Sequence, residues 1–143
     1  MALDNAGTTL LANKILNALH TTASTTTLGA QTITFPILVR LMTANGSATA
    51  NGTELGTGGS YTTASTGINT GPGANWAAAS AGSQATSAVC SQTGMPVATI
   101  VGIELWDSTA TKIRTEWGSM TSKTTASGDT LSFAIGAISS ALA

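Results

Sequence analysis

Few residues of this chain have side chains that could act in catalysis. A nucleophilic Ser, Thr or Cys needs a base beside it, but His20 is the only histidine and Cys90 the only cysteine. Neither stands in a catalytic motif. We interpret His20 as a solvated or capping residue near the end of a helix and Cys90 as a small buried hydrophobe. A reactive thiol or an interchain bridge is the alternative for Cys90, because one cysteine excludes an intrachain disulfide.

Carboxylates offer a second kind of chemistry. Glu104 and Asp107 lie near the end of one expected strand, and Glu116 lies in the next. A glycosidase would need two such carboxyls facing each other across a cleft. Lys112 and Arg114 belong to the same expected hairpin, so a set of cross-strand ion pairs is the simpler interpretation.

Oxygen ligands for calcium are present at two turns and one loop. Asp107 and Asp129 occupy turns, and Glu54 lies in an Asn-rich loop, but their spacing does not match an EF-hand. Turn capping is the expected role of the two aspartates. The glycines of residues 56–59 precede no helix and lack the lysine of a phosphate loop. We therefore expect no catalytic residues, no metal and no cofactor.

The composition indicates one domain with few charges. The 143 residues suit a single domain, expected over residues 1–143. Hydrophobic residues make up 42%, enough to fill a core, whereas charged residues make up only 8% against about 25% in an average soluble domain. A surface so poor in charge is weakly protected against self-association. This favours a component of an assembly.

Charge and hydropathy also exclude several partners. The net charge of −1 and the lack of basic runs argue against nucleic acid. No hydrophobic run approaches the ~20 residues of a membrane span, so we expect no membrane partner. The N-terminus lacks the pattern of a signal peptide. We expect synthesis in the cytoplasm without an export signal.

One helix is predicted over residues 4–21. Leu11, Ile15 and Leu19 recur at four-residue spacing and form one apolar stripe. A short helix with a narrow stripe must dock on its own sheet or on a neighbouring subunit. Residues 21–31 are polar and unpatterned, so a linker is expected there.

Alternating hydrophobicity predicts several strands. Residues 32–42 place Ile33, Phe35, Ile37, Val39 and Leu41 on one face, and Pro36 favours an edge strand or a bulge. Residues 97–106 form the strongest strand, with Val101, Ile103 and Leu105 on one face and Ile100, Glu104 and Trp106 on the other. Further short strands are expected within residues 75–81, 83–92, 112–117 and 131–135, and residues 138–142 close the chain. This pattern predicts an all-β fold, a compact β-sandwich or jelly roll over residues 32–143, preceded by the helix.

Two surfaces are expected from the loops and aromatic residues. Two Asn-Gly pairs begin at Asn45 and Asn51 and favour turns with positive φ. We expect an exposed loop or tip formed by Asn45, Asn51, Glu54 and Tyr61. Trp76 and Trp117 are assigned to the core, whereas Trp106 is assigned to an outer face. The expected assembly surface comprises Leu11, Ile15, Leu19 and Trp106.

Segments along most of the chain resemble a family of small structural proteins of tailed bacteriophages, commonly labelled tail fibre proteins. NKILNALH at residues 13–20 is similar to its N-terminal helix, and LMTA at 41–44 to the end of its first long strand. Glu54 with residues 58–61 resembles its Glu…Gly-Gly-Tyr loop, although Ser60 separates the glycines from Tyr61 and Thr62-Thr63 replaces an Ala-Arg. GIELWD at 102–107 and GDTL at 128–131 complete the order. The resemblance implies a virion protein without catalytic residues.

The leading hypothesis is therefore a non-enzymatic virion protein, most simply a capsid decoration or cementing protein on the outer shell. It would form a homotrimer and contact the major capsid protein or other virion subunits. The chain is short and lacks both a shaft repeat and a heptad stalk, which argues against a fibre shaft. One alternative is a tail-fibre or tail-tip module that binds a host glycan on an aromatic platform at Tyr61 or Trp76. A small cell-wall hydrolase is the other.

Overall fold

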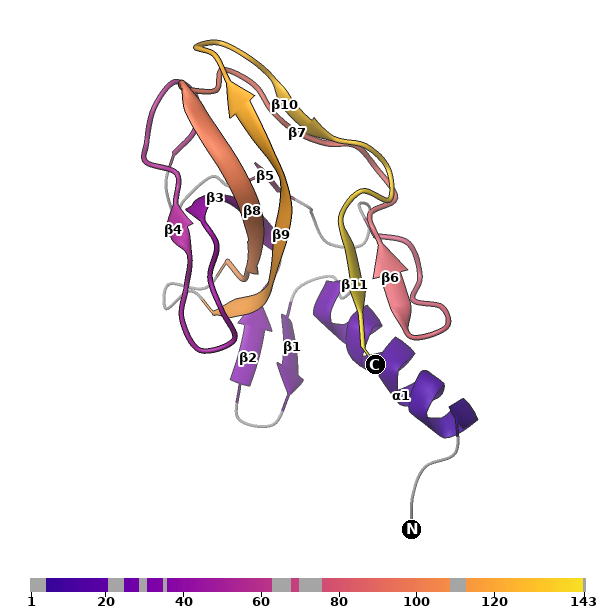
Figure 1. Ribbon diagram of the computed structural model, residues 1–143. Coiled ribbons are helices and arrows are strands. Elements are labelled where there is room, and N and C mark those ends of the chain that lie inside the picture. The colour runs from indigo at the N-terminus through magenta and orange to yellow at the C-terminus, as the bar shows by residue number, and fades with distance from the viewer. Residues whose placement is uncertain are drawn as a thin grey trace.

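One helix and eleven short strands make up the part of the chain that the computed structural model describes, residues 5–20, 25–28, 31–34, 36–62, 68–69, 76–108 and 113–142 (Figure 1). The fold is all-β apart from the N-terminal helix, as predicted. The elements are α1 (Asn5–His20), β1 (Thr25–Leu28), β2 (Gln31–Thr34), β3 (Leu38–Ala44), β4 (Thr53–Glu54), β5 (Ile68–Asn69), β6 (Ser83–Ala85), β7 (Cys90–Gln92), β8 (Ala98–Trp106), β9 (Arg114–Thr125), β10 (Leu131–Phe133) and β11 (Ser139–Ala141).

The largest sheet is antiparallel and has the order β4-β3-β8-β9, with β5 also pairing with β3. The central pair aligns Leu38 with Trp106 and Met42 with Gly102. β3 is buried on both faces, because Val39 and Leu41 point into the core while Arg40 and Met42 are covered on the opposite face. Among the described strands, β9 forms one edge of this sheet.

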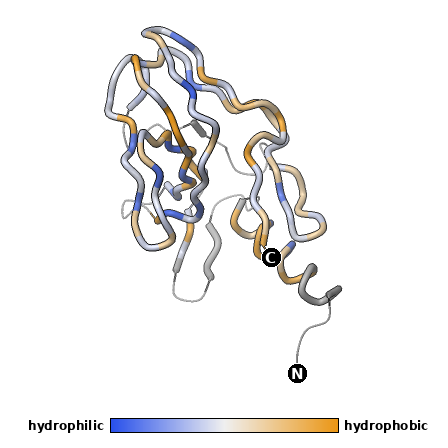
Figure 2. The backbone as a smooth tube through the Cα atoms, viewed as in Figure 1, coloured by the Kyte–Doolittle hydropathy of each residue, from blue (hydrophilic) through white to orange (hydrophobic). Residues whose placement is uncertain are grey.

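Two short ladders, β7-β10 and β6-β11, form the second layer. Cys90, Leu131, Phe133 and Ile138 from this layer share one hydrophobic core with the sheet. This burial confirms that Cys90 is a small core residue. In Figure 2 most of the chain carries pale colours, because Thr, Ser, Gly and Ala lie near the middle of the hydropathy scale. A few large apolar side chains therefore supply most of the packing.

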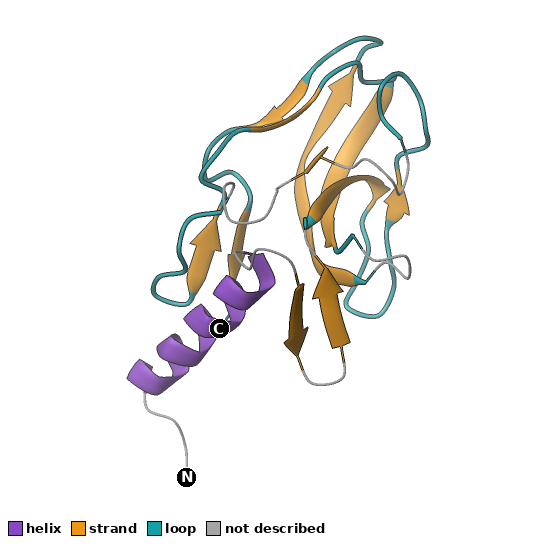
Figure 3. Cartoon of the chain, turned by 180° about the vertical axis from the view of Figure 1, so that it is seen from behind, coloured by secondary structure: helices purple, strands orange, loops and turns teal. Residues whose placement is uncertain are grey.

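The helix docks on its own chain. It lies against β6 and β11, and its N-terminal end points away from the strands (Figures 1 and 3). The Oδ1 atoms of Asn13 and Asn17 accept hydrogen bonds from the backbone N–H groups of Gly82 and Ala79, at 2.8 and 2.9 Å. These bonds satisfy two loop amides and fix the rotation of the helix about its axis.

The buried stripe of α1 differs from the predicted one. Ala12 and Leu16 are buried, and Leu19 packs against the core. Leu11 is exposed instead and Ile15 is only partly covered. Both stripes are apolar, so the helical period alone does not choose between them.

Other boundaries also differ from the prediction. The linker expected over residues 21–31 contains β1, which pairs with β2. The single strand predicted over residues 32–42 is two strands, and Pro36 lies between them rather than in an edge strand. Because Pro36 lies outside both strands, its lack of an N–H group removes no hydrogen bond from either ladder. Phe35 lies outside the described residues. β9 is longer than predicted and continues to Thr125, whereas the turn at residues 127–129 is confirmed by the positive φ of Gly128.

The face assignment of β8 was wrong at one position. Ile100 was placed opposite Leu105 by alternation, yet both belong to the core. The register shifts between Ile100 and Gly102, where one residue of β8 faces three residues of β9. Such a bulge bends and twists the strand, so strict alternation does not hold across it.

The docked helix makes a testable prediction. We expect Leu16→Ala to lower the free energy of unfolding by about 2–5 kcal/mol, because Leu16 is fully buried. Leu10→Ala is the matched control, since Leu10 is exposed on the same helix and should cost less than about 0.5 kcal/mol. Urea unfolding of both variants measures the difference, and equal effects would contradict the docked face described here.

Candidate functional site

A loop between β3 and β4, residues 45–53, folds back over the sheet and is held by one carboxylate. Glu104 lies two residues before the end of β8 and is only 1% exposed. Its Oε1 accepts hydrogen bonds from the Gly52 backbone N–H at 2.7 Å and from Arg114 Nη1 at 2.9 Å. Its Oε2 accepts a bond from Trp106 Nε1 at 3.0 Å. Three donors from separate segments thus compensate its buried charge.

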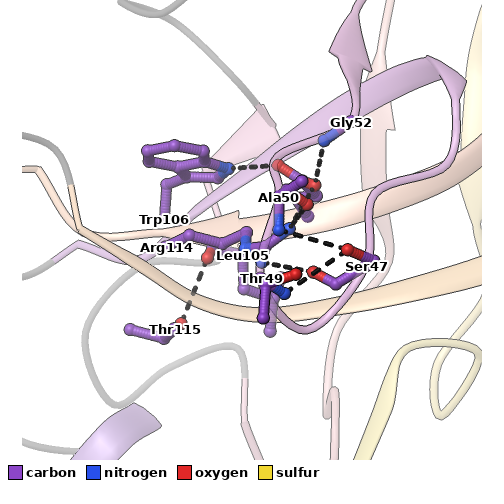
Figure 4. Close-up of polar contacts among 9 residues, drawn as sticks. Ser47, Thr49, Ala50, Gly52, Leu105, Trp106, Arg114 and Thr115 are labelled. Atoms are coloured by element: carbon purple, nitrogen blue, oxygen red, sulfur yellow. Dashed lines mark hydrogen bonds and ion pairs between the residues drawn. The ribbon is translucent and has the colours of Figure 1, made fainter.

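Arg114 completes the link between sheet and loop. Besides its ion pair with Glu104, it donates from Nη1 to the Ala50 carbonyl at 2.8 Å and from Nη2 to the Ser47 carbonyl at 2.6 Å. Figure 4 shows this fork reaching from β9 to the loop. Within the loop, the Ser47 N–H donates to the Ala50 carbonyl at 2.8 Å. The predicted cross-strand ion pairing is thereby confirmed for Glu104 and Arg114, whereas Lys112 lies outside the described residues.

The two Asn-Gly pairs serve close approach rather than turn geometry. Gly46 and Gly52 do not have positive φ, contrary to expectation. A Cβ on Gly46 would lie 2.7 Å from Arg114 Nη1, and one on Gly52 would lie 2.9 Å from the Gly46 backbone nitrogen. Real Cβ atoms do not approach so closely. Glycine is therefore required here because the loop passes directly over the ion pair.

A second ion pair lies beside the first. Arg40 Nη1 contacts Glu54 Oε2 at 3.2 Å, and the Arg40 guanidinium stacks over the Trp106 ring, 4.1 Å from its centroid. The Tyr61 hydroxyl donates to Glu54 Oε1 at 2.9 Å and accepts from the Leu41 N–H at 3.3 Å. Burial is the main cause that raises the pKa of Tyr61 far above its ordinary value, and the nearby Glu54 charge raises it further.

Together these residues form what we call the loop clamp: Arg40, Glu54, Tyr61, Glu104, Trp106 and Arg114. Its two arginines and two glutamates balance in charge, and both carboxylates are paired with groups of the same chain. Arg40 Nε and Nη2 are buried and have no hydrogen-bond partner, so the Trp106 ring is their main compensation. Such an arrangement can rigidify a loop, but its oxygens are already committed to internal donors.

The aspartates have the predicted turn-capping role. Asp107 Oδ1 accepts from the Ile113 N–H at 2.7 Å, and Asp129 Oδ2 accepts from the Ala126 N–H at 2.8 Å. Among the described residues, no group of three His, Cys, Asp or Glu side chains is placed to hold a metal ion. No described helix is long and apolar enough to cross a membrane. The side chain of His20 lies outside the described residues.

An opening of mixed polarity separates the two layers along β9. We call it the interlayer groove; it runs between β9 and residues 133–142. Its apolar lining residues are Leu19, Ile103, Trp117, Met120, Ile138 and Leu142, and its polar ones include Thr115, Ser119, Ser139 and Ser140. Glu116 is the charged residue in this lining. Trp117 is 46% exposed here, so the tryptophan at the surface is Trp117 and not the predicted Trp106.

The structure brings some predicted site residues together but not at an exposed tip. Asn45 and Asn51 are exposed as expected, but Tyr61 is fully buried and Glu54 is largely covered. Trp106 is 8% exposed because the Arg40 guanidinium covers its ring, so it cannot belong to an outer assembly surface. Of the predicted assembly residues, Leu11 is exposed and Leu19 lines the interlayer groove.

Comparison of the chain with protein-family models, curated proteins and solved structures finds no match. The function therefore has to be argued from the clamp, the groove and the exposed apolar residues themselves. Sequence reasoning missed Arg40 as a clamp residue. A lone arginine within an apolar strand was the available signal, because a buried arginine requires a partner.

The clamp predicts that one carboxylate holds the loop. Glu104→Gln should lower the free energy of unfolding by about 3 kcal/mol, because it removes the buried countercharge of Arg114. The Gly52 amide should exchange faster, since its acceptor is weakened. Glu116→Gln, on the neighbouring strand, is the control and should leave Gly52 protection unchanged. Hydrogen-exchange mass spectrometry measures both, and unaltered exchange in Glu104→Gln would refute the clamp.

Tyr61 predicts an alkaline loss of stability. Below pH 10 the phenol is protonated in both states, but above it the unfolded chain releases the proton first. The free energy of unfolding should then fall by about 1.4 kcal/mol per pH unit. Tyr61→Phe should lose about 1–3 kcal/mol at neutral pH, through its lost hydrogen bonds, and should lack this slope.

Urea unfolding between pH 8 and 11 (roughly two units below to one unit above the ordinary phenol pKa of about 10) provides the measurement. Both proteins should carry Cys90→Ala, because burial also raises the pKa of the Cys90 thiol and would add a slope of the same sign. Parallel alkaline curves for the two proteins would show that Tyr61 is not the responsible group.

Proposed function

We propose that this chain is a non-enzymatic structural protein of a tailed-bacteriophage particle, carried on the outer capsid as a decoration or cementing protein. Its partners would be further copies of itself, as a homotrimer, and the major capsid protein or other virion subunits. The observation that carries the proposal is the apolar surface left uncovered on a chain with only 8% charged residues. The sequence resemblance to phage structural proteins is the reason for proposing that the assembly is a phage particle.

The uncovered apolar residues lie at several places on the described surface. Leu10 and Leu11 are exposed on α1, Trp117 and Leu142 at the interlayer groove, and Val97 beside β8. Contiguous apolar patches on a protein surface are typical of interaction sites, and Leu10 and Leu11 are adjacent in sequence on α1. A stable contact of ordinary size buries about 1,600 Å², and surfaces of this character are suited to such burial.

The loop clamp supports an assembly role in a different way. Catalysis needs a titratable group aimed at a substrate, whereas Glu104 and Glu54 are aimed at internal donors. The clamp instead fixes the shape of an exposed loop that contains Asn45 and Asn51. A rigid loop loses little conformational entropy when it meets another subunit.

The tail-fibre alternative was based on an exposed aromatic platform at Tyr61 or Trp76. Tyr61 and Trp76 are both buried in the core, so neither presents a ring to a glycan. Trp117 is the exposed aromatic residue of the described chain, but it lies beside Leu142 and the groove. An apolar neighbourhood suits a protein partner better than a sugar rich in hydroxyl groups.

Counting copies in purified particles tests the proposal. Quantitative mass spectrometry should give a copy number proportional to that of the major capsid protein, and labelled antibodies should coat the head. A tail-tube subunit and the major capsid protein serve as internal references. A small fixed number on the tail would favour the glycan-binding alternative, and absence from particles would overturn the proposal. Turnover of peptidoglycan by the folded protein would do the same.

A further inference from the structure

The two Asn-Gly pairs between β3 and β4 stand in almost the same local sequence. Residues 43–47 are TANGS and residues 49–53 are TANGT. Both asparagines, Asn45 and Asn51, are exposed to solvent. A difference between them in chemical reactivity would therefore arise from the tertiary structure and not from the neighbouring residues.

An asparagine that precedes a glycine can react with its own backbone. The glycine nitrogen gives its proton to water or hydroxide and attacks the asparagine Cγ. A bond forms between that nitrogen and Cγ, the bond from Cγ to the side-chain nitrogen breaks, and ammonia leaves after taking up a proton. Water then opens the cyclic imide to give aspartate or isoaspartate. Glycine favours the attack because it has no Cβ and leaves the backbone flexible.

The loop clamp holds the attacking nitrogen of the second pair. The Gly52 N–H donates to Glu104 Oε1 at 2.7 Å (Figure 4), a charge-assisted hydrogen bond. Loss of this proton would break the bond and would place a second negative charge beside a carboxylate that is only 1% exposed. Repulsion between two charges is strong where water is excluded. The carboxylate is also too weak a base to remove an amide proton itself.

The first pair lacks this protection. Among the described residues, the Gly46 N–H makes no hydrogen bond. The Gly46 nitrogen can therefore lose its proton without breaking a bond to a carboxylate. Asn45 is exposed to the water that completes the reaction.

We infer that Asn45 is a site of spontaneous deamidation and that the loop clamp protects Asn51 from the same reaction. The modification needs water and no enzyme or cofactor. The inference goes beyond the proposed function, because it concerns the covalent chemistry of the isolated chain and holds whether or not the chain belongs to a particle.

The product at residue 45 should loosen the clamp. The Asn45 Oδ1 lies against Gly102, two residues before Glu104 on β8, so a carboxylate at this position adds a negative charge near the buried one. In isoaspartate the main chain also gains the side-chain methylene. Even a single Cβ on Gly46 would collide with Glu104 and Arg114, so the lengthened loop cannot keep the same path over the ion pair.

The first experiment incubates the purified full chain in mildly alkaline buffer, with and without denaturing urea. Tandem mass spectrometry localises the mass gain to each asparagine, and methylation by an isoaspartyl methyltransferase counts isoaspartate. In urea the two sites should react at similar rates. In the folded chain Asn45 should react roughly tenfold or more faster than Asn51, because a hydrogen bond to a charged group must break at Gly52. Equal rates in the folded chain, or a faster reaction at Asn51, would overturn the inference.

Glu104→Gln tests whether the carboxylate is the protecting group. The Asn51 rate should rise roughly tenfold toward the Asn45 rate, whereas Glu116→Gln is the control and should change neither rate. An unchanged Asn51 rate in folded Glu104→Gln would refute protection by the clamp. If Glu104→Gln unfolds, both of its rates will equal those in urea, and the wild-type comparison, which needs no substitution, decides the question.

Asn45→Asp tests the consequence for the loop. Hydrogen-exchange mass spectrometry should show faster exchange of the Gly52 amide in this variant than in the wild-type chain. Thr49→Asp adds the same charge at another exposed position of the loop and should have a smaller effect. Equal exchange in Asn45→Asp and the wild-type chain would show that modification at residue 45 does not reach the clamp.

Discussion

A buried carboxylate near the end of a central strand is the constraint on which the rest of this structure depends. Glu104 is only 1% exposed, so protein groups rather than water must compensate its negative charge. It recruits Arg114 from the neighbouring strand, Trp106 from its own strand and the Gly52 amide from the loop after β3. Each of these partners fixes another element. Arg114 holds the loop carbonyls, and Trp106 provides the ring on which Arg40 rests.

The clamp also explains why the second face of the sheet is covered without a second layer of strands. Arg40 and Met42 of β3 are buried on that face, although the ladders β7-β10 and β6-β11 pack on the other. A loop rich in Asn, Gly and Thr has little apolar surface with which to cover a sheet, so hydrophobic burial alone cannot hold it. Polar bonds to Glu104 and Arg114 take that role.

Local patterns in the sequence predicted the elements well, and non-local contacts account for most errors. The helix, the strand β8 and the turn after β9 follow from apolar spacing and from turn residues. The burial of Trp106 depends on Arg40, which is 66 residues away in the chain, and no local pattern records that pairing. The tight passage of Gly46 and Gly52 over the ion pair likewise has no local signal. The two Asn-Gly pairs are equally typical of glycines in turns.

The helix shows why hydrophobic periodicity alone cannot identify which face is buried. Residues 10, 11, 12, 15, 16 and 19 are all apolar, so the hydrophobic stripe is too wide to define one buried face. Asn13 and Asn17 decide between the possibilities, because their side chains find backbone donors at residues 79–82. A polar residue inside a helix was thus more informative about docking than the leucines were, but only once its partners were known.

The same docking determines which leucines of α1 stay exposed. A helix that rolled freely on the surface would not hold any of its side chains in one position. Leu16 in the core and two asparagine bonds hold α1 in one orientation, so Leu10 and Leu11 are presented in a fixed position. Their exposure leaves apolar surface in contact with water, which is unfavourable. The apolar interior thus stabilises the fold, and the bonds of Asn13 and Asn17 fix which apolar residues of the helix stay outside it.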